Sequence, residues 1–207
     1  MKNKKIKAVL FDLGGVIIDI DYLKTIQAFT DLGLKNAKTL YNQFDQGQVF
    51  DDYEVGSISS DAFIEAVQKK IQSPISAIQI TEAWNAMIGT YPINKLDFIM
   101  DLSQRIPCYL LSNTNEIHLK RAREVITKTK YARIELLFEK CYYSHIIGKR
   151  KPHIETFQWV IKDMSCKAEE VLFIDDSLQH IEGAKKAGIN TIHFQKDTRF
   201  KEIEDWL

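Results

Sequence analysis

Four short polar stretches carry residue types that could do chemistry together. They are Asp12, Ser112 with Asn113, Lys151, and Asp175 with Asp176. Carboxylates gathered at one place repel each other unless a divalent cation neutralises them, and oxygen ligands without His or Cys favour Mg²⁺. Beside such an ion, Asp12 is suited to attack phosphorus and form an aspartyl-phosphate that water then hydrolyses. Hydrogen bonds from Ser112 and Asn113 and the charge of Lys151 would then stabilise the anionic transition state.

Apolar runs precede these stretches and predict how they are positioned. Residues 8–11, 108–111 and 171–174 are typical of strands buried on both faces, and a further run at 141–144 precedes the lysine loop. From residue 93 onward such strands alternate with helical patterns, which predicts a Rossmann-like, doubly wound parallel sheet of the α/β class. The carboxyl ends of parallel strands share one edge, where ligands bind. Each polar residue taken alone could belong to an ordinary turn or to a solvated helix start. Neither explanation accounts for the convergence of all of them at one edge of the sheet.

Residues 17–92 have a different pattern, helical throughout and without strand-like alternation. Helices are expected around Ile26 and Phe29, around Leu40 to Phe44, behind a cap at Ser59, and around Trp84. We therefore predict a catalytic core of residues 1–16 and 93–207, with residues 17–92 inserted as an all-helical cap. Residues 52–56 could form a loop that reaches the site. Aromatic side chains at helical spacing are more often core than pocket, so the following are only candidates for pocket lining: Tyr22, Phe44, Phe50, Tyr53 and Trp84.

Composition excludes several classes of partner. The 207 residues include 28 basic and 28 acidic side chains, so no basic surface favours nucleic acid. No apolar stretch is long enough for a membrane span or a signal peptide, which indicates a cytoplasmic protein without a membrane partner. The three cysteines form no CxxC pair and are expected to be free thiols.

The order and spacing of the motifs resemble the haloacid dehalogenase (HAD) superfamily of aspartate-nucleophile hydrolases, subfamily IA. The four family motifs look like residues 11–16, 110–113, 151–152 and 173–177. The helical stretch after the first motif is similar to the family's C1-type cap. The Asp-Leu-Gly opening, the Ser-Asn-Thr-Asn run and the Arg-Lys-Pro loop are most similar to the sugar-phosphatase-type, glucose-1-phosphatase-like branch.

This resemblance implies a role for each matching residue. Asp12 would be the nucleophile and a Mg²⁺ ligand, and the carbonyl of Gly14 and the carboxylates of Asp175 and Asp176 would complete the metal site. Catalysis would also use Ser112 and Lys151, and these two residues with Asn113 would bind the phosphate. The chain is then expected to be a phosphatase for a small phosphorylated metabolite, with a sugar phosphate as one candidate, and to work as a monomer or dimer.

Two positions depart from the family pattern. Most phosphatases of the family carry a second Asp, the general acid and base, where this chain has Gly14. Loss of a positioned proton donor typically costs about two to four powers of ten in rate. A good leaving group would need this help least, and a group of the substrate or of the cap could also take its place. His180 lies four residues after Asp176. It could be a partner of the site, but a position on the surface of a helix is the favoured interpretation.

Gly14 also leaves two other functions open. A metal-independent 2-haloacid dehalogenase lacks the second Asp as well, but Asp175 and Asp176 would then crowd the nucleophile with uncompensated negative charge. A catalytically weak HAD-fold protein that binds or regulates is the other alternative, although its remaining site residues would be intact.

Overall fold

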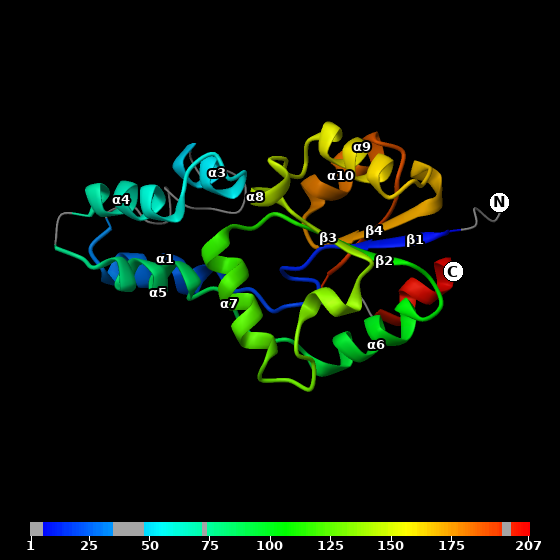
Figure 1. Cartoon of the computed structure of the whole chain (residues 1–207), viewed down its shortest axis with the longest axis horizontal. Coiled ribbons are helices and arrows are strands. Elements are labelled where there is room, and N and C mark those ends of the chain that lie inside the picture. Colours follow the sequence, from blue (N-terminus) through cyan, green and yellow to red (C-terminus); the bar gives the residue numbers. More distant parts are fainter. Residues whose placement is uncertain (1–5, 35–47, 72–73, 196–199) are drawn as a thin grey trace.

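The computed structural model describes residues 6–34, 48–71, 74–195 and 200–207, which form a five-stranded parallel sheet with helices on both faces and a helical segment at one end (Figure 1). The strands lie in the order β3-β2-β1-β4-β5. Their bounds are β1 Ala8–Phe11, β2 Cys108–Ser112, β3 Lys140–Tyr143, β4 Val171–Asp175 and β5 Asn190–His193. The Rossmann-like parallel sheet expected from the apolar runs is confirmed.

Alternate residues of the central strand face two different layers of helices. Val9 and Phe11 pack in one apolar cluster with helices α6 (Ile93–Ser103) and α7 (Glu116–Ile126). Ala8 and Leu10 pack in another with helices α9 (Ile154–Asp163) and α10 (Leu178–Lys186). Because all four residues of β1 are buried, the strand has no polar face, as expected for the centre of a covered parallel sheet.

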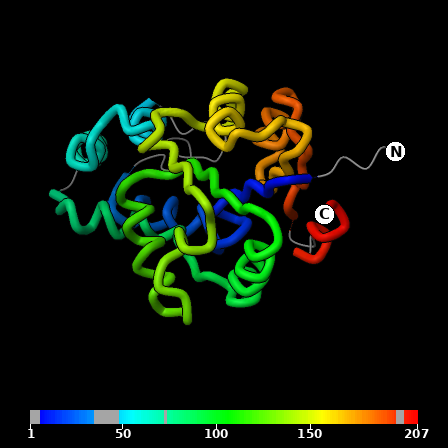
Figure 2. Tube along the Cα trace, turned by 45° about the vertical axis from the view of Figure 1, so that its right-hand side comes forward, coloured from blue at the N-terminus to red at the C-terminus, as the bar shows by residue number. Residues whose placement is uncertain are grey.

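Shorter elements connect these layers. The described part also contains helix α8 (Ser144–Ile147) and the 3-10 helices η1 (Ile134–Leu137), η2 (Ala168–Glu170) and η3 (Phe200–Trp206). In both views η3, at the C-terminus, lies at the side of the molecule away from the helical segment (Figures 1 and 2). No helix in the described ranges is long and apolar enough to cross a membrane.

The helical segment lies beyond the carboxyl ends of the strands (Figure 1). It contains α1 (Tyr22–Asp31), α3 (Gln48–Glu54), α4 (Ser60–Lys70) and α5 (Ala77–Asn85). Its helices share an apolar cluster centred on Phe63, whose ring lies 5.1 Å from that of Trp84 and 4.4 Å from that of Tyr53. The expected cap at Ser59 is confirmed, because its hydroxyl accepts a hydrogen bond from Ala62 N at 3.2 Å.

The sequence-based expectations for this segment need one correction. Residues 52–54 are the last turn of α3 and not part of a loop, since the chain turns only at Gly56, which has a φ of +72°. The helix expected around Leu40 to Phe44 lies outside the described residues. The proposed boundaries of core and cap, at residues 16 and 92, remain a prediction.

The segment leaves and rejoins the sheet through two adjacent connections. Asp19 N donates to Thr90 O at 2.9 Å, and Gly89 N donates to Asp19 O at 2.8 Å. Ile20 and Ile88 form an antiparallel bridge beside them. The two connections therefore lie side by side, next to the carboxyl edge of the sheet.

Candidate active site

Carboxylates from two neighbouring strands meet at the carboxyl edge of the sheet. Asp12 directly follows β1, Asp175 ends β4, and Asp176 comes next. One oxygen from each of the three side chains lies within 4.8 Å of the others. Since β1 and β4 flank the point where the strand order reverses, this is the crevice in which doubly wound sheets bind ligands. The structure thus brings together the three carboxylates that the sequence predicts to converge.

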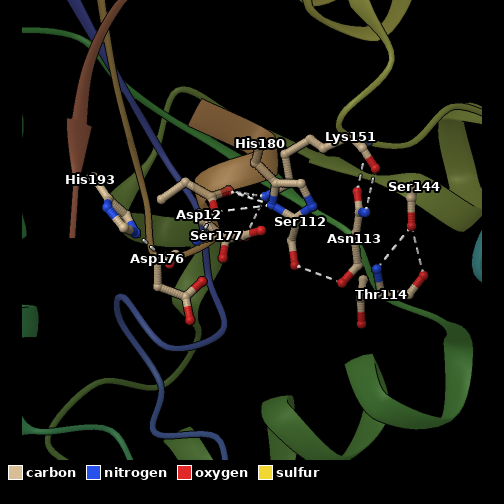
Figure 3. Close-up of polar contacts among 11 residues, drawn as sticks. Asp12, Ser112, Asn113, Thr114, Ser144, Lys151, Asp176, Ser177, His180 and His193 are labelled. Atoms are coloured by element: carbon tan, nitrogen blue, oxygen red, sulfur yellow. Dashed lines mark hydrogen bonds and ion pairs between the residues drawn. The ribbon is translucent and has the colours of Figure 1, made fainter. Parts of the chain in front are cut away.

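Lys151 contacts two of these carboxylates, and its contact with Asp12 is drawn in Figure 3. Its Nζ donates to Asp12 Oδ1 at 2.7 Å and to Asp175 Oδ2 at 2.6 Å, and the side chain is completely buried. Burial alone would lower the pKa of Lys151, but the two carboxylates raise it to about 12. Lys151 is therefore a charged group inside the site, and the alternative of a solvated loop lysine is excluded.

The cluster has the charge and the donor atoms of a divalent cation site. Burial, together with the negative charges of Asp175 and Asp176, raises the pKa of Asp12 well above its usual range. Burial and the neighbouring Asp175 raise the pKa of Asp176 to about 6. One ammonium group cannot balance three carboxylates, and a hard divalent cation with oxygen ligands would relieve the excess. The residues present therefore fit Mg²⁺.

Gly15 allows Asp176 to occupy its position. The residue has a φ of +73°, and a Cβ at this position would overlap Oδ2 of Asp176. Any other residue here would therefore be strained in the left-handed backbone conformation, and its side chain would collide with a carboxylate of the cluster. Gly14 lies beside it in the wall of the pocket. Its carbonyl as a metal ligand remains a prediction.

Asn113 holds the lysine loop against the end of β2. Its Nδ2 donates to Lys151 O at 2.9 Å, and its Oδ1 accepts from Lys151 N at 3.0 Å. The side-chain amide, expected to donate to phosphoryl oxygens, is thus engaged with the backbone of Lys151, so its role in phosphate binding remains a prediction. Ser112 lies in the pocket wall beside it. The next residue, Thr114, is fixed by Ser144, whose Oγ accepts from Thr114 N and donates to Thr114 O, both at 2.8 Å (Figure 3).

His180 belongs to the site, and its favoured assignment to the helix surface is wrong. Its Nδ1 lies 2.9 and 3.0 Å from the two carboxylate oxygens of Asp175, and its side chain is 13% exposed. Burial and the charge of Lys151 lower the pKa of His180, so the ring is neutral at pH 7 and Nδ1–H donates. Ser177 N also donates to Asp175, at 2.8 Å. Asp175 is thereby fixed by three donors from three different residues.

A pocket opens from these carboxylates toward the helical segment. Beyond the residues proposed for catalysis, phosphate and metal, its wall includes Glu54, His118 and Arg150. Of the aromatic candidates, Tyr22 lines the pocket, whereas three pack in the apolar cluster of the segment: Phe50, Tyr53 and Trp84. Phe44 lies outside the described residues.

Glu54 and Arg150 connect the helical segment to the lysine loop. Arg150 Nε lies 2.8 Å from Glu54 Oε2, and the same guanidinium contacts Asp51, one turn earlier on α3. Glu54 is 8% exposed, and this burial raises its pKa to about 7 although Arg150 acts in the opposite direction. Sequence analysis missed this pair, although Glu54 lies within the stretch 52–56 that was expected to reach the site.

His118 forms a second connection between the segment and the core. Its Nε2 lies 2.9 Å from Trp84 O, which can only accept, so this nitrogen carries the proton. Nδ1 then accepts from Asn115 Nδ2 at 3.2 Å, and the ring stacks on Trp84 with 4.5 Å between centroids. Burial lowers the pKa of His118 to about 4, so it is a neutral residue of the pocket wall.

Comparison with known proteins gives matches over nearly the whole chain. A family model described as haloacid dehalogenase-like hydrolase matches residues 6–188. The chain is 33% identical over 186 residues to a D-ribitol-5-phosphate phosphatase of Bacteroides thetaiotaomicron, and the match covers 90% of each protein. A crystal structure of a HAD family enzyme from the same organism, in complex with magnesium and inorganic phosphate, is 32% identical with a TM-score of 0.87 and covers 96% of this chain and 98% of that one. The structure of a predicted HAD-like family hydrolase from Porphyromonas gingivalis is 28% identical with a TM-score of 0.87 and covers 97% of each chain.

Proposed function

This chain belongs to the haloacid dehalogenase-like hydrolases, and we propose that it is a Mg²⁺-dependent phosphatase that cleaves a small phosphorylated sugar or polyol through an aspartyl-phosphate. The family and the class of phosphomonoester hydrolase expected from the motifs are confirmed by the family match and the phosphatase relative. The observation that carries the proposal is the cluster of Asp12, Asp175 and Asp176, in which the buried Lys151 contacts Asp12 and Asp175.

Each residue of this cluster has a task in phosphoryl transfer. Asp12 attacks phosphorus, and the leaving alcohol departs from the opposite side. Lys151 orients the Asp12 carboxylate through Oδ1 and places positive charge beside the phosphoryl oxygens. His180 and the backbone N–H of Ser177 hold Asp175 in place, and Asp175 in turn holds Lys151. Water then cleaves the aspartyl-phosphate and releases inorganic phosphate.

Asp12, Asp175 and Asp176, with the carbonyl of Gly14, are the groups that would hold Mg²⁺. When bound, the ion would neutralise the carboxylates and withdraw charge from the phosphoryl group. The helical segment would act as the cap, because it supplies Tyr22 and Glu54 to the wall of the same pocket. Closure of this segment over a bound substrate would exclude bulk water from the reaction.

A phosphorylated sugar or polyol is supported by the relative and by the polar wall of the pocket. The curated relative is named for D-ribitol 5-phosphate. In this chain the pocket wall offers Tyr22, Glu54 and Arg150, whose polar groups are able to bind substrate hydroxyls.

The test is phosphate release from a panel of sugar and polyol phosphates, with and without Mg²⁺. Wild type is compared with Asp12→Asn, which keeps the size of the side chain and removes the nucleophilic charge. We expect Mg²⁺-dependent release that Asp12→Asn abolishes. No release from any ester would contradict the proposal, and metal-independent chloride release from a 2-chloro acid would establish the dehalogenase alternative.

A further inference from the structure

We propose that Glu54, on the last turn of α3, donates the proton to the leaving oxygen and so replaces the side chain that is missing at Gly14. This inference rests on the proposed phosphatase function and adds a catalytic residue to it. Glu54 lines the same pocket as Asp12 and Gly14 but enters it from the helical segment. It therefore borders the pocket from outside the carboxylate cluster, and in this proposal the ester group of the bound substrate lies between Glu54 and Asp12.

The other two carboxyl groups of the described pocket wall belong to the carboxylate cluster. Asp12 is held by Lys151, and Asp176 belongs to the carboxylate cluster. Both ring nitrogens of His118 have partners, and Nδ1 of His180 is directed at Asp175. Among the titratable residues described in this wall, Glu54 is the carboxyl group outside the cluster.

The contact with Arg150 holds Glu54 without fixing its proton. Arg150 Nε lies 2.8 Å from Glu54 Oε2, yet the N–H is not directed along this contact, and neither atom has a hydrogen-bond partner among the described residues. The guanidinium thus positions the carboxyl group by charge. The protonated carboxyl remains able to donate to an oxygen of the substrate.

The charges that face Glu54 keep it close to the protonation equilibrium that acid–base catalysis needs. Arg150 and Lys151, from the loop before α9, favour its ionised form. Burial and Asp51, on its own helix, favour the protonated form, and Tyr22 of α1 lies within range of its charge. A group that is part acid and part base at neutral pH can donate in one step and accept in the next.

The two steps balance as follows. An oxygen of Asp12 forms a bond to phosphorus while the bond between phosphorus and the ester oxygen breaks. The ester oxygen keeps the electron pair of the broken bond and takes the proton of Glu54. The Glu54 carboxylate then removes a proton from the attacking water. The bond between phosphorus and Asp12 breaks, phosphate leaves, and Glu54 is protonated again for the next turnover.

Leaving-group dependence tests this role directly. Substituted phenyl phosphates, from 4-nitrophenyl to phenyl phosphate, have nearly the same shape but leaving groups of increasing basicity. They also lack substrate hydroxyls that Glu54 could bind. The measurement is kcat/KM for wild type, Glu54→Gln, Glu54→Asp and Asp51→Asn, since kcat/KM covers the steps up to departure of the leaving group.

We expect Glu54→Gln to lower kcat/KM for phenyl phosphate by about 100-fold or more, within the usual range for a general acid. The decrease in kcat/KM for 4-nitrophenyl phosphate should be much smaller. Its kcat/KM should therefore fall more steeply with leaving-group basicity than that of wild type. Glu54→Asp keeps a proton and should recover part of the wild-type slope. Asp51→Asn is the matched control, because Asp51 contacts the same guanidinium from the same helix. It keeps the Glu54 carboxyl group and its proton, so its kcat/KM should fall with leaving-group basicity less steeply than that of Glu54→Gln.

Two results would overturn the role of Glu54 while the phosphatase stands. One is an equal loss on every ester in Glu54→Gln, which is the result of a purely structural ion pair. The other is no loss at all. Failure of wild type to hydrolyse any phosphomonoester with Mg²⁺ would instead remove the proposed function and the role of Glu54 with it.

Discussion

Replacing Gly15 by Ala should weaken the metal site from a position that contributes no side chain to it. The left-handed backbone at Gly15 costs a non-glycine residue about 1–2 kcal/mol. The new Cβ would in addition overlap Oδ2 of Asp176, so the carboxylate must turn away from Asp12 and Asp175. Gly148 provides the matched control, since it has a φ of +64° and a Cβ there would meet nothing within 4 Å. Gly148→Ala therefore carries the backbone cost without the collision.

The assay is urea unfolding with and without Mg²⁺, together with calorimetric Mg²⁺ titration. Without Mg²⁺ the backbone cost destabilises both variants. We expect the Mg²⁺ Kd of Gly15→Ala to rise about 10- to 100-fold, the range seen when the support of a metal ligand is lost. At saturating Mg²⁺ this variant should then gain about 1.4 to 2.7 kcal/mol less stability than wild type. Gly148→Ala should gain as much as wild type. Equal Mg²⁺ affinity in the two variants would refute the argument that Gly15 makes room for Asp176.

Three further substitutions test separate parts of the structure. Lys151→Met should lower the free energy of unfolding without Mg²⁺ by about 3–5 kcal/mol, because it leaves Asp12 and Asp175 buried without their cation; urea unfolding measures this, and a loss below about 1 kcal/mol would mean that the pair is solvated. Thr25→Val should cost about 1–3 kcal/mol in thermal unfolding, because Met87 N loses the buried Thr25 Oγ1 acceptor at 3.1 Å; unchanged stability would argue against that bond. The pKa of Glu54 is raised from 4.5 to about 7 in the folded state, so the folded protein binds this proton more tightly and its ionisation reduces stability as pH rises from about 4.5 to about 7. Glu54→Gln should therefore be more stable relative to wild type at pH 8 than at pH 5, by up to about 3 kcal/mol in urea unfolding, and a pH-independent difference would contradict the raised pKa.

The sequence predicts the sheet and the carboxylate cluster because both depend on local patterns. An apolar run such as residues 8–11 has few alternatives to a covered strand, and the residue that follows such a strand necessarily lies at the carboxyl edge. Asp12, Asp175 and Asp176 could therefore be placed together without knowledge of any side-chain contact. Ser59 was predictable for the same reason, since a helix cap is a bond between near neighbours.

Sequence analysis could not predict the contacts of three site residues, because these contacts join distant parts of the chain. The position of His180 on α10 does not reveal that its ring meets Asp175. Glu54 contacts Arg150, which belongs to the loop before α9. The amide of Asn113 is engaged by the backbone of Lys151, and the type of neither residue indicates that pairing. Tertiary packing decides these positions, and local propensity carries no information about it.

The paired connections at residues 19–20 and 88–90 have a consequence for how such an enzyme can diversify. Because Asp19 bonds directly to Gly89 and Thr90, everything between them departs from and returns to a single point on the scaffold. The inserted segment therefore disturbs the sheet no more than one short turn would, whatever its length or architecture. The entropic cost of closing such a loop also grows only slowly with its length. One helical excursion could be exchanged for another of different size without moving Asp12 relative to Asp175. In this fold the substrate specificity can therefore change during evolution while the catalytic residues and their reaction stay the same.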